Sequence, residues 1–161
     1  MTFTQEGQRR PSEITQHVRS VLNEILEALL VRFQKDLVSV VLFGSHARGD
    51  PHQHSDIDLV VVVEKAPSDW RERGALELSI EQLGLKLGRA IQIILVEPED
   101  VRYSVENIAP LMLEIHDAHV CLFDREGFFQ EEMVRFSRNM EERGVRKLGA
   151  HKWEVPVRVS S

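Results

Sequence analysis

Hydrophobic residues recur along the chain with two different periods, which separate the segments expected to be helices from those expected to be strands. From Ser12 onward, apolar residues return every three or four positions, the spacing of an amphipathic helix with one face on a core. This stripe consists of Ile14, Val18, Val21, Leu22, Ile25, Leu26, Leu29, Leu30 and Phe33. The same spacing predicts helices over residues 70–83 and 128–140, and two shorter helices divided near Pro110.

Four other apolar runs are too short for independent helices, and their β-branched composition predicts strands. They span Leu37–Phe43, Asp56–Val63, Ala90–Val96 and His119–Phe123. The second run ends in successive valines, which is typical of a central strand that is covered on both faces. Because helices and strands alternate along the chain, we predict an α/β or α+β domain.

The length and composition of the chain indicate one domain with a real core. The chain has 161 residues, of which 42% are hydrophobic, enough for one sizeable core with little room for a second. We expect a loose N-terminal arm over residues 1–11, the domain over 12–148 and a C-terminal tail over 149–161.

The charge and cysteine content exclude several classes of protein. The formal net charge is -6, which disfavours long DNA or RNA as a partner because such partners require a broad basic surface. Cys121 is the single cysteine and cannot form an internal disulfide, and we find no signal peptide or membrane-spanning run. A cytoplasmic location is therefore expected. The basic residues of 143–152 are interpreted as cations that complement a helix C-terminus, with a binding patch as the alternative.

The candidate chemistry lies in the segment Leu42–Val63, "LFGSHARGDPHQHSDIDLVVVV". Asp56 and Asp58 are two residues apart at the start of a predicted strand, so their side chains point to the same face with Cα atoms roughly 6 to 7 Å apart. Two carboxylates this close repel each other unless a cation lies between them. Oxygen ligands favour Mg²⁺, which binds through one or two carboxylates together with substrate phosphates.

The turn before these acids supplies a complementary feature. Gly44 follows a buried strand and allows the backbone to approach a ligand closely, while the Ser45 hydroxyl can donate a hydrogen bond to a phosphate oxygen. Arg48 is either a phosphate contact or the structural partner of a loop carboxylate, and we favour the structural role. A glycine-serine turn alone is weak evidence, but it becomes specific when the two aspartates follow it.

The segment "GSHARGDPHQHSDIDLVVVV" resembles the signature of the minimal nucleotidyltransferases of the DNA polymerase beta-like superfamily. This resemblance implies a small mixed β-sheet flanked by helices, the nucleotidyltransferase fold. It implies an enzyme that transfers an NMP, AMP being favoured, from an NTP, ATP being favoured, with Mg²⁺ ions held by Asp56 and Asp58. The implied nucleotide-binding residues are Gly44, Ser45, Arg48 and Ser55, although Ser55 is better explained as ordering the chain before the strand.

Members of this family usually carry a third carboxylate on the next strand, and here the sequence departs from the pattern. The matching positions hold Gln92 and Ile94, with the missing acid aligned at Ile94. Glu97 is a weak substitute because it lies past the predicted strand on the opposite parity. Loss of this acid is expected to weaken transfer more than nucleotide binding. The alternative function is therefore a nucleotide-binding or interaction module, antitoxin-like, that has lost turnover.

The acceptor hydroxyl could belong to a small molecule, an RNA end or a partner protein, and the resemblance adds a small helical partner of toxin-antitoxin systems. The sequence identifies neither the partner nor the oligomeric state, and a homodimer is one option. A zinc site on His46, His52 and His54 together with Asp56 matches no established ligand spacing. Cys121 is interpreted as a small core residue, and not as a nucleophile paired with nearby histidines. Trp70 is also expected in the core.

Overall fold

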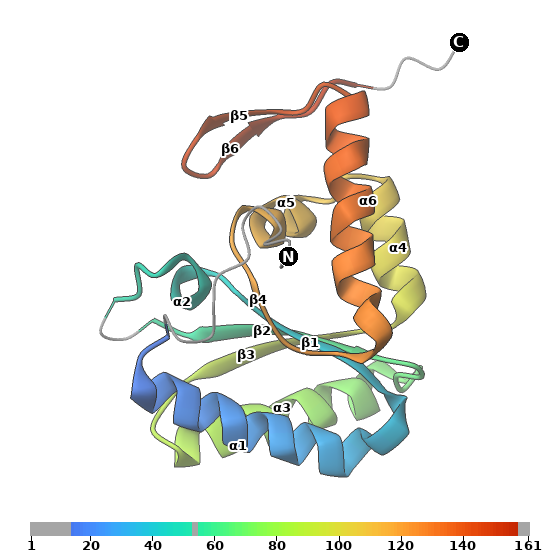
Figure 1. Cartoon of the computed structure of the whole chain (residues 1–161). Coiled ribbons are helices and arrows are strands. Elements are labelled where there is room, and N and C mark those ends of the chain that lie inside the picture. The colour runs from blue at the N-terminus through green and yellow to red at the C-terminus, as the bar shows by residue number, and fades with distance from the viewer. Residues whose placement is uncertain (1–13, 53–54, 158–161) are drawn as a thin grey trace.

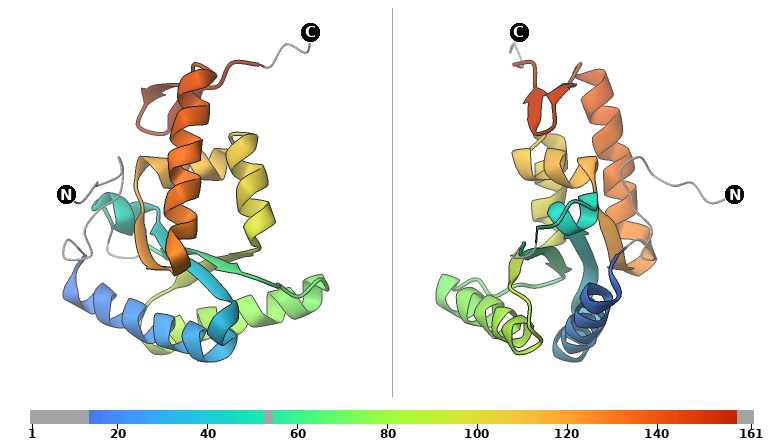
Figure 2. Two further views of the ribbon diagram at one scale, coloured as in Figure 1. Left: turned by 45° about the vertical axis from the view of Figure 1, so that its right-hand side comes forward. Right: turned by 90° about the vertical axis from the view of Figure 1, so that its left-hand side faces the viewer.

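The computed structural model describes residues 14–52 and 55–157 and shows a mixed sheet between two layers of helices. Helices α1 (Gln16–Phe33) and α3 (Trp70–Lys86) cover one face of the sheet (Figure 1). Helices α4 (Pro98–Glu106), α5 (Pro110–Asp117) and α6 (Phe128–Glu142) lie on the other face, and the views of Figure 2 show the same separation. The resemblance implied this fold, a small mixed sheet flanked by helices, and the structure confirms it.

The sheet contains four strands in the order β3-β2-β1-β4. The strands are β1 (Leu37–Phe43), β2 (Ile57–Val63), β3 (Ile91–Val96) and β4 (Val120–Asp124). Strand β1 is antiparallel to both β2 and β4, whereas β2 and β3 are parallel because α3 connects them as a crossover. The predicted strands are confirmed to within a residue at each end, and the valine-rich strand β2 is central, as expected.

Alternate residues of the central strands face two separate hydrophobic cores. In β2, the residues Ile57, Leu59, Val61 and Val63 pack with α1 and α3, whereas Val60 and Val62 pack with α4, α5 and α6. Asp58 shares the parity of Val60 and therefore lies on the α4–α6 face of the sheet. This parity decides which helices can contribute side chains to the start of β2.

The C-terminal basic segment differs from the prediction. Helix α6 ends at Glu142, and the basic residues that follow form a two-stranded hairpin of β5 (Arg146–Gly149) and β6 (Lys152–Glu154). Arg143 caps the C-terminus of α6, as expected for one of these cations. The cations after it do not belong to a helix C-terminus, because Gly144 with φ 66° turns the chain away from the helix axis. Trp70 was also expected in the core, but its side chain is 75% exposed and stacks with Arg71.

The short connections complete the described chain. They are the 3₁₀ turns η2 (Gln34–Asp36) and η3 (Arg125–Gly127) and the one-turn helix α2 (Ser45–Arg48). None of the helices in the described part of the chain is long and apolar enough to cross a membrane. The expected N-terminal arm lies outside the described residues.

Candidate functional site

The two aspartates lie at the start of β2, on the face that α5 covers. Asp56 immediately precedes the strand and Asp58 is its second residue. Burial, together with the negative charges of Asp56 and Glu114, raises the pKa of Asp58 from 3.8 to about 6, and Arg48 opposes this shift. Close carboxylates with this electrostatic cost are the kind of donor set that a divalent cation stabilises.

Gly44 supports this arrangement from the end of β1. Phe43 pairs with Asp58 across the two strands, so the turn that follows Phe43 lies against the aspartate. Gly44 has φ 76°, and a Cβ atom at this position would lie 2.4 Å from Asp58 Oδ2. Only glycine therefore fits under the carboxylate, both in conformation and in space. The turn that follows the buried strand β1 therefore lies in contact with Asp58.

The helical turn α2 follows directly and carries two more of the predicted residues. Ser45 begins this turn, and its carbonyl oxygen accepts hydrogen bonds from the backbone N–H groups of Gly49 and Asp50. Arg48 Nε donates to Asp50 Oδ1 at 3.3 Å, and Arg48 Nη1 lies 3.9 Å from Glu114 Oε1. Arg48 therefore connects the loop to α5 through two carboxylates.

Ser55 orders the loop that leads into β2. Its hydroxyl accepts a hydrogen bond from the His52 N–H at 2.6 Å, and its carbonyl oxygen lies 3.2 Å from Nε2 of the buried His46. No group of three His, Cys, Asp or Glu side chains in the described residues could hold a metal ion. His54, the third residue of the zinc alternative, lies outside the described residues.

The strand register locates the position where the third carboxylate was expected. Gln92 pairs with Asp58 in the parallel ladder, whereas Ile94 pairs with Val60 farther along. The residue beside the acid is therefore Gln92, and not Ile94 as aligned from the sequence. Glu97 lies at the opposite end of β3, where its side chain accepts a hydrogen bond from the N–H of Ala66. A substitution by Glu97 is thus excluded by distance along the strand.

The acid that sequence reasoning missed is Glu114. It lies on α5, more than 50 residues from the aspartates, and reaches the site because α5 packs on the face of the sheet that Asp58 occupies. Its side chain is 46% exposed and faces Arg48. Nothing in the local sequence distinguishes Glu114 from an ordinary solvent-facing glutamate, so only the packing of α5 reveals it.

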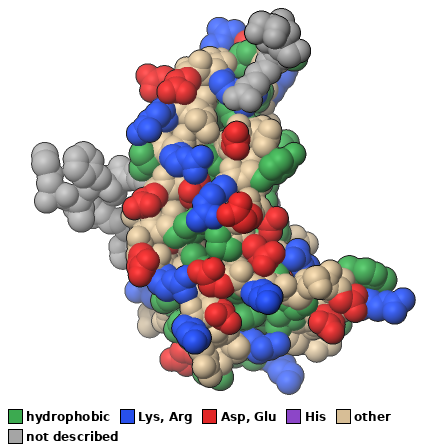
Figure 3. All heavy atoms as spheres, turned by 90° about the vertical axis from the view of Figure 1, so that its right-hand side faces the viewer, with side chains coloured by type: hydrophobic (Ala, Val, Ile, Leu, Met, Phe, Trp, Pro, Cys, Tyr) green, Lys and Arg blue, Asp and Glu red, His purple; other side chains and the backbone are tan. Residues whose placement is uncertain are grey.

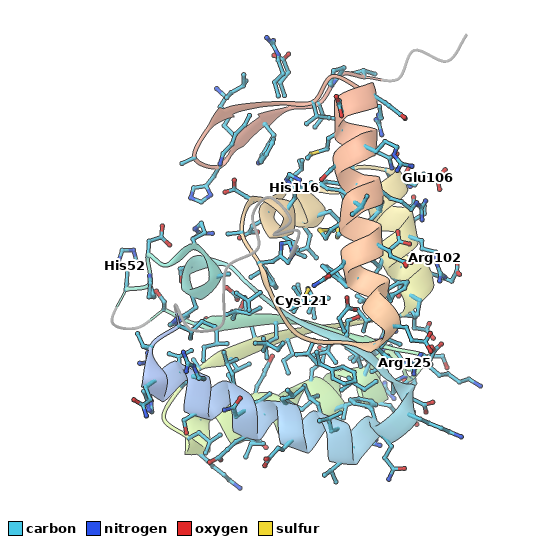
Figure 4. The ribbon with its side chains drawn as sticks, in the orientation of Figure 1. His52, Arg102, Glu106, His116, Cys121 and Arg125 are labelled. Atoms are coloured by element: carbon cyan, nitrogen blue, oxygen red, sulfur yellow. The ribbon has the colours of Figure 1, made fainter. Side chains whose placement is uncertain are left out.

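Cys121 lies on β4 and His116 on α5 (Figure 4), so neither belongs to the segments that carry the two aspartates. Burial raises the pKa of the Cys121 thiol to about 12. A thiol that stays protonated is a poor nucleophile, which agrees with the interpretation of Cys121 as a packing residue.

Comparisons with known proteins give this geometry a context. The sequence model described as "Nucleotidyltransferase domain" matches residues 22–115. A protein of Methanocaldococcus jannaschii whose name describes a protein adenylyltransferase is 33% identical over 119 residues, which cover 73% of this chain and 80% of that protein.

Solved structures share the fold at low sequence identity. A spectinomycin adenyltransferase from Enterococcus faecialis, solved with ATP and spectinomycin, has a TM-score of 0.52 and 14% identity over 76% of this chain and 65% of that one. A chain of a toxin-antitoxin complex with AMP-PNP has a TM-score of 0.49 and 22% identity over 75% of this chain and 91% of that one.

The matched residues 22–115 contain the glycine-serine turn, both aspartates, Gln92 and Glu114, so the family resemblance and the site geometry coincide in one part of the chain. With this match and the archaeal relative, the chain belongs to the nucleotidyltransferase domain family and is a nucleotidyltransferase enzyme of the minimal type.

Proposed function

We propose that this protein is a Mg²⁺-dependent adenylyltransferase that moves AMP from ATP to a hydroxyl group of a partner protein. The observation that carries the proposal is the carboxylate of Asp58, partly buried against Gly44 and surrounded by the charges of Asp56 and Glu114. The name of the archaeal relative supports AMP and a protein acceptor. A small-molecule hydroxyl or an RNA end is the alternative acceptor.

The residues present fit the metal that this chemistry needs. Asp56 and Asp58 would hold Mg²⁺ through their carboxylate oxygens, with the triphosphate supplying further oxygen ligands. When bound, the metal neutralises charge on the phosphates and polarises the α-phosphate for attack. The raised pKa of Asp58 supports this assignment, because a nearby cation offsets the burial and the repulsion from Asp56 and Glu114 that raise it.

The other predicted residues have roles that follow from their positions. The Gly44–Ser45 turn lies against Asp58, so backbone groups and the Ser45 hydroxyl are close to where the phosphates would bind. Arg48 orients the loop through Asp50 and faces the same site, where its charge can also meet a phosphate. Ser55 orders the chain before Asp56 and is assigned no direct contact.

A binding module without turnover is the second candidate function. It is favoured by one observation, that an amide side chain and not a carboxylate stands beside Asp58 in the strand ladder, at Gln92. Such a module would bind Mg²⁺-ATP through the same turn and acids. It would act through a partner protein, for which the small helical partner implied by the family resemblance is the first choice.

Surface charge supports a compact or protein acceptor over a long polynucleotide. The face built on α4 and α6 intersperses acidic and basic side chains without a broad area of positive charge (Figure 3). The net charge of -6 gives little electrostatic gain with a phosphate backbone, and the face in Figure 3, which is turned away from α2, offers no basic alternative surface.

The test is transfer of label from α-³²P-ATP in the presence of Mg²⁺ and a cell extract. We expect the wild-type protein to label a macromolecular band, Asp58→Ala to abolish the label, and Asp36→Ala, an exposed acid on η2, to leave it unchanged. Labelling by the wild-type protein that survives in Asp58→Ala would contradict the proposed site. Calorimetric binding of Mg²⁺-ATP without any transfer would establish the binding module instead.

A further inference from the structure

A pocket of about 550 Å³ lies between α5 and the C-terminal hairpin. Its wall on α5 includes Pro110, Leu113, Glu114 and Asp117, and its wall on the hairpin includes His151 and Trp153. A volume of several hundred Å³ with apolar walls and a few polar groups is typical of ligand sites. In Figure 1 the hairpin extends over α5 on the side of the molecule where α2 lies.

The hairpin is held against α5 by specific contacts. The Lys147 ammonium forms an ion pair with Asp117 and lies 5.6 Å from the centroid of the Trp153 ring. Trp153 itself is partly buried and packs against the core between α5 and α6. Across the hairpin, Arg146 pairs with Glu154 at 2.7 Å. These contacts give the pocket a defined second wall, built from residues beyond the matched family region of 22–115.

Glu114 belongs both to this pocket and to the candidate active site. It lines the pocket, and its Oε1 lies 3.9 Å from Arg48 Nη1. Arg48 in turn acts on Asp58 together with Glu114, which places all three charges around one region.

We propose that this pocket, which we name the hairpin pocket, binds the acceptor, and that Glu114 on its inner wall is the general base of the reaction. The inference rests on the proposed function and names its acceptor site. In the step, the acceptor O–H gives its proton to the Glu114 carboxylate while its oxygen forms a bond to the α-phosphorus. The bond from that phosphorus to the β-phosphate bridging oxygen breaks, and pyrophosphate leaves with the electron pair.

This role replaces the carboxylate that the strand lacks. Gln92 stands at the position beside Asp58 and cannot accept a proton as a base. Glu114 approaches from α5, on the same face of the sheet, and its half-exposed side chain can meet a molecule that enters from solvent. The base is thus supplied by a helix that packs above the acids.

The walls of the pocket select the chemical class of the acceptor. Pro110, Leu113 and Trp153 offer apolar and aromatic surface, and Glu114 and Asp117 are acidic. A hydroxyl carried on an apolar body fits this surface, because the apolar and aromatic walls can pack against that body while the hydroxyl reaches Glu114. We therefore assign the pocket to a hydroxyl-bearing side chain of a protein and not to the end of an RNA.

The first test measures how Glu114 affects the labelling rate, using α-³²P-ATP, Mg²⁺ and the same cell extract. We expect Glu114→Gln to lower the initial rate about 100-fold or more, as loss of a general base does, with the Kd for Mg²⁺-ATP by calorimetry changed less than threefold. Glu106→Gln, an exposed acid on the far side of the molecule from His52 (Figure 4), is the matched control and should keep the wild-type rate.

Rescue of the labelling rate by a small carboxylate distinguishes a general base at Glu114 from a residue with a purely structural role. Sodium formate should restore part of the rate of Glu114→Ala and none of the rate of Asp58→Ala. A Glu114→Gln rate within threefold of wild type, or a loss of rate matched by an equal loss of Mg²⁺-ATP affinity, would overturn the assignment of Glu114. If the wild-type protein transfers no label, the proposed function fails, and this inference fails with it. If the wild-type protein transfers label and Glu114→Gln does so at the same rate, only this inference fails.

A second pair of variants tests the hairpin pocket. Trp153→Ala should raise the amount of extract needed for half-maximal labelling at least fivefold while leaving the Kd for Mg²⁺-ATP unchanged. Trp70→Ala removes an equally large but exposed ring far from the pocket and should have no effect. Unchanged acceptor dependence in Trp153→Ala would overturn the assignment of the pocket.

Discussion

Asp58 illustrates how a single residue can be costly for the fold and useful for the chemistry. Its carboxylate lies against Gly44 and within the field of two other acids, and this environment raises its pKa to about 6. The unfolded chain imposes no such cost, because there the carboxylate is surrounded by water. The metal-free protein therefore stores an unfavourable interaction that binding of a cation and a nucleotide would relieve.

The first prediction concerns the stability of the metal-free protein. Asp58 has a folded-state pKa of about 6 against 3.8 when unconstrained, so the folded state holds the proton longer, and the free energy of unfolding falls as pH rises from about 4 to about 6. Asp58→Asn avoids this loss. Allowing for solvent screening, we expect it to be more stable than wild type by about 1 kcal/mol above pH 6 and to lose this advantage near pH 4.

Urea denaturation in EDTA at pH 4, 5, 6 and 7 measures this difference. Asp36→Asn, which alters an exposed acid on η2, controls for the change in net charge. A constant difference between Asp58→Asn and wild type across the series would contradict the prediction.

At the scale of elements, Gly84 determines how closely the crossover helix α3 packs on strand β3. The predicted helix ended at residue 83, but α3 continues to Lys86 and Gly84 is buried inside it. A Cβ at Gly84 would lie 2.6 Å from Ile91 Cδ1 and 2.9 Å from the Arg89 carbonyl oxygen. The absence of a side chain thus lets the helix approach the first residue of β3, which pairs beside Ile57 at the start of β2.

The second prediction compares two glycines of the same helix. Gly84→Ala should destabilise the protein by about 1 to 3 kcal/mol, because the new methyl group forces α3 away from β3. The Arg89 carbonyl oxygen belongs to the backbone and cannot move aside as a side chain could. Gly74→Ala places its methyl group in open space and should stabilise the protein by about 0.5 to 1 kcal/mol through helix propensity. Urea midpoints of the two variants measure both effects, and equal shifts in the same direction would refute this account of the packing.

On the scale of the whole molecule, the core beneath α4, α5 and α6 contains a buried histidine, His119. Its effect on stability has the opposite pH dependence to that of Asp58. His119 is buried, its Nδ1 donates a hydrogen bond to the Ile115 carbonyl oxygen at 2.9 Å, and its Nε2 has no hydrogen-bond partner among the described residues. Burial lowers the pKa of His119 below 6.5, its ordinary value. The unfolded chain takes up this proton first as the pH falls, so acid destabilises the fold through His119.

The third prediction follows from the loss of stability that His119 causes in acid. On going from pH 7.5 to pH 5.5, protonation of Asp58 adds the same stability to all the proteins compared, so the effect of His119 is a difference between them. The free energy of unfolding of His119→Asn should rise relative to that of the wild type, because no imidazole remains to be protonated in the unfolded state. His17→Asn, which changes an exposed histidine on α1, should respond to pH like the wild type. Urea denaturation at the two pH values tests this, and an identical change in the free energy of unfolding of all three proteins would contradict it.

The sequence by itself determined the elements and the chemistry carried by one continuous segment. The periods of 3.6 and 2 residues predicted the helices and strands because each period reports which side of an element meets a core. Gly44, Ser45, Asp56 and Asp58 could be found because their spacing is local. The basic tail, by contrast, was assigned to a helix end, because its few residues carry no period that distinguishes a hairpin.

Tertiary structure alone decided how distant residues meet the aspartates. The parallel register of β2 and β3 put Gln92 beside Asp58 and moved Glu97 to the opposite end of the sheet. The packing of α5 on the same face brought Glu114 to the site, and the hairpin closed a pocket over it. These relations depend on strand pairing and helix packing between residues far apart in the chain, and such contacts leave no mark on the local pattern of hydrophobic and polar residues.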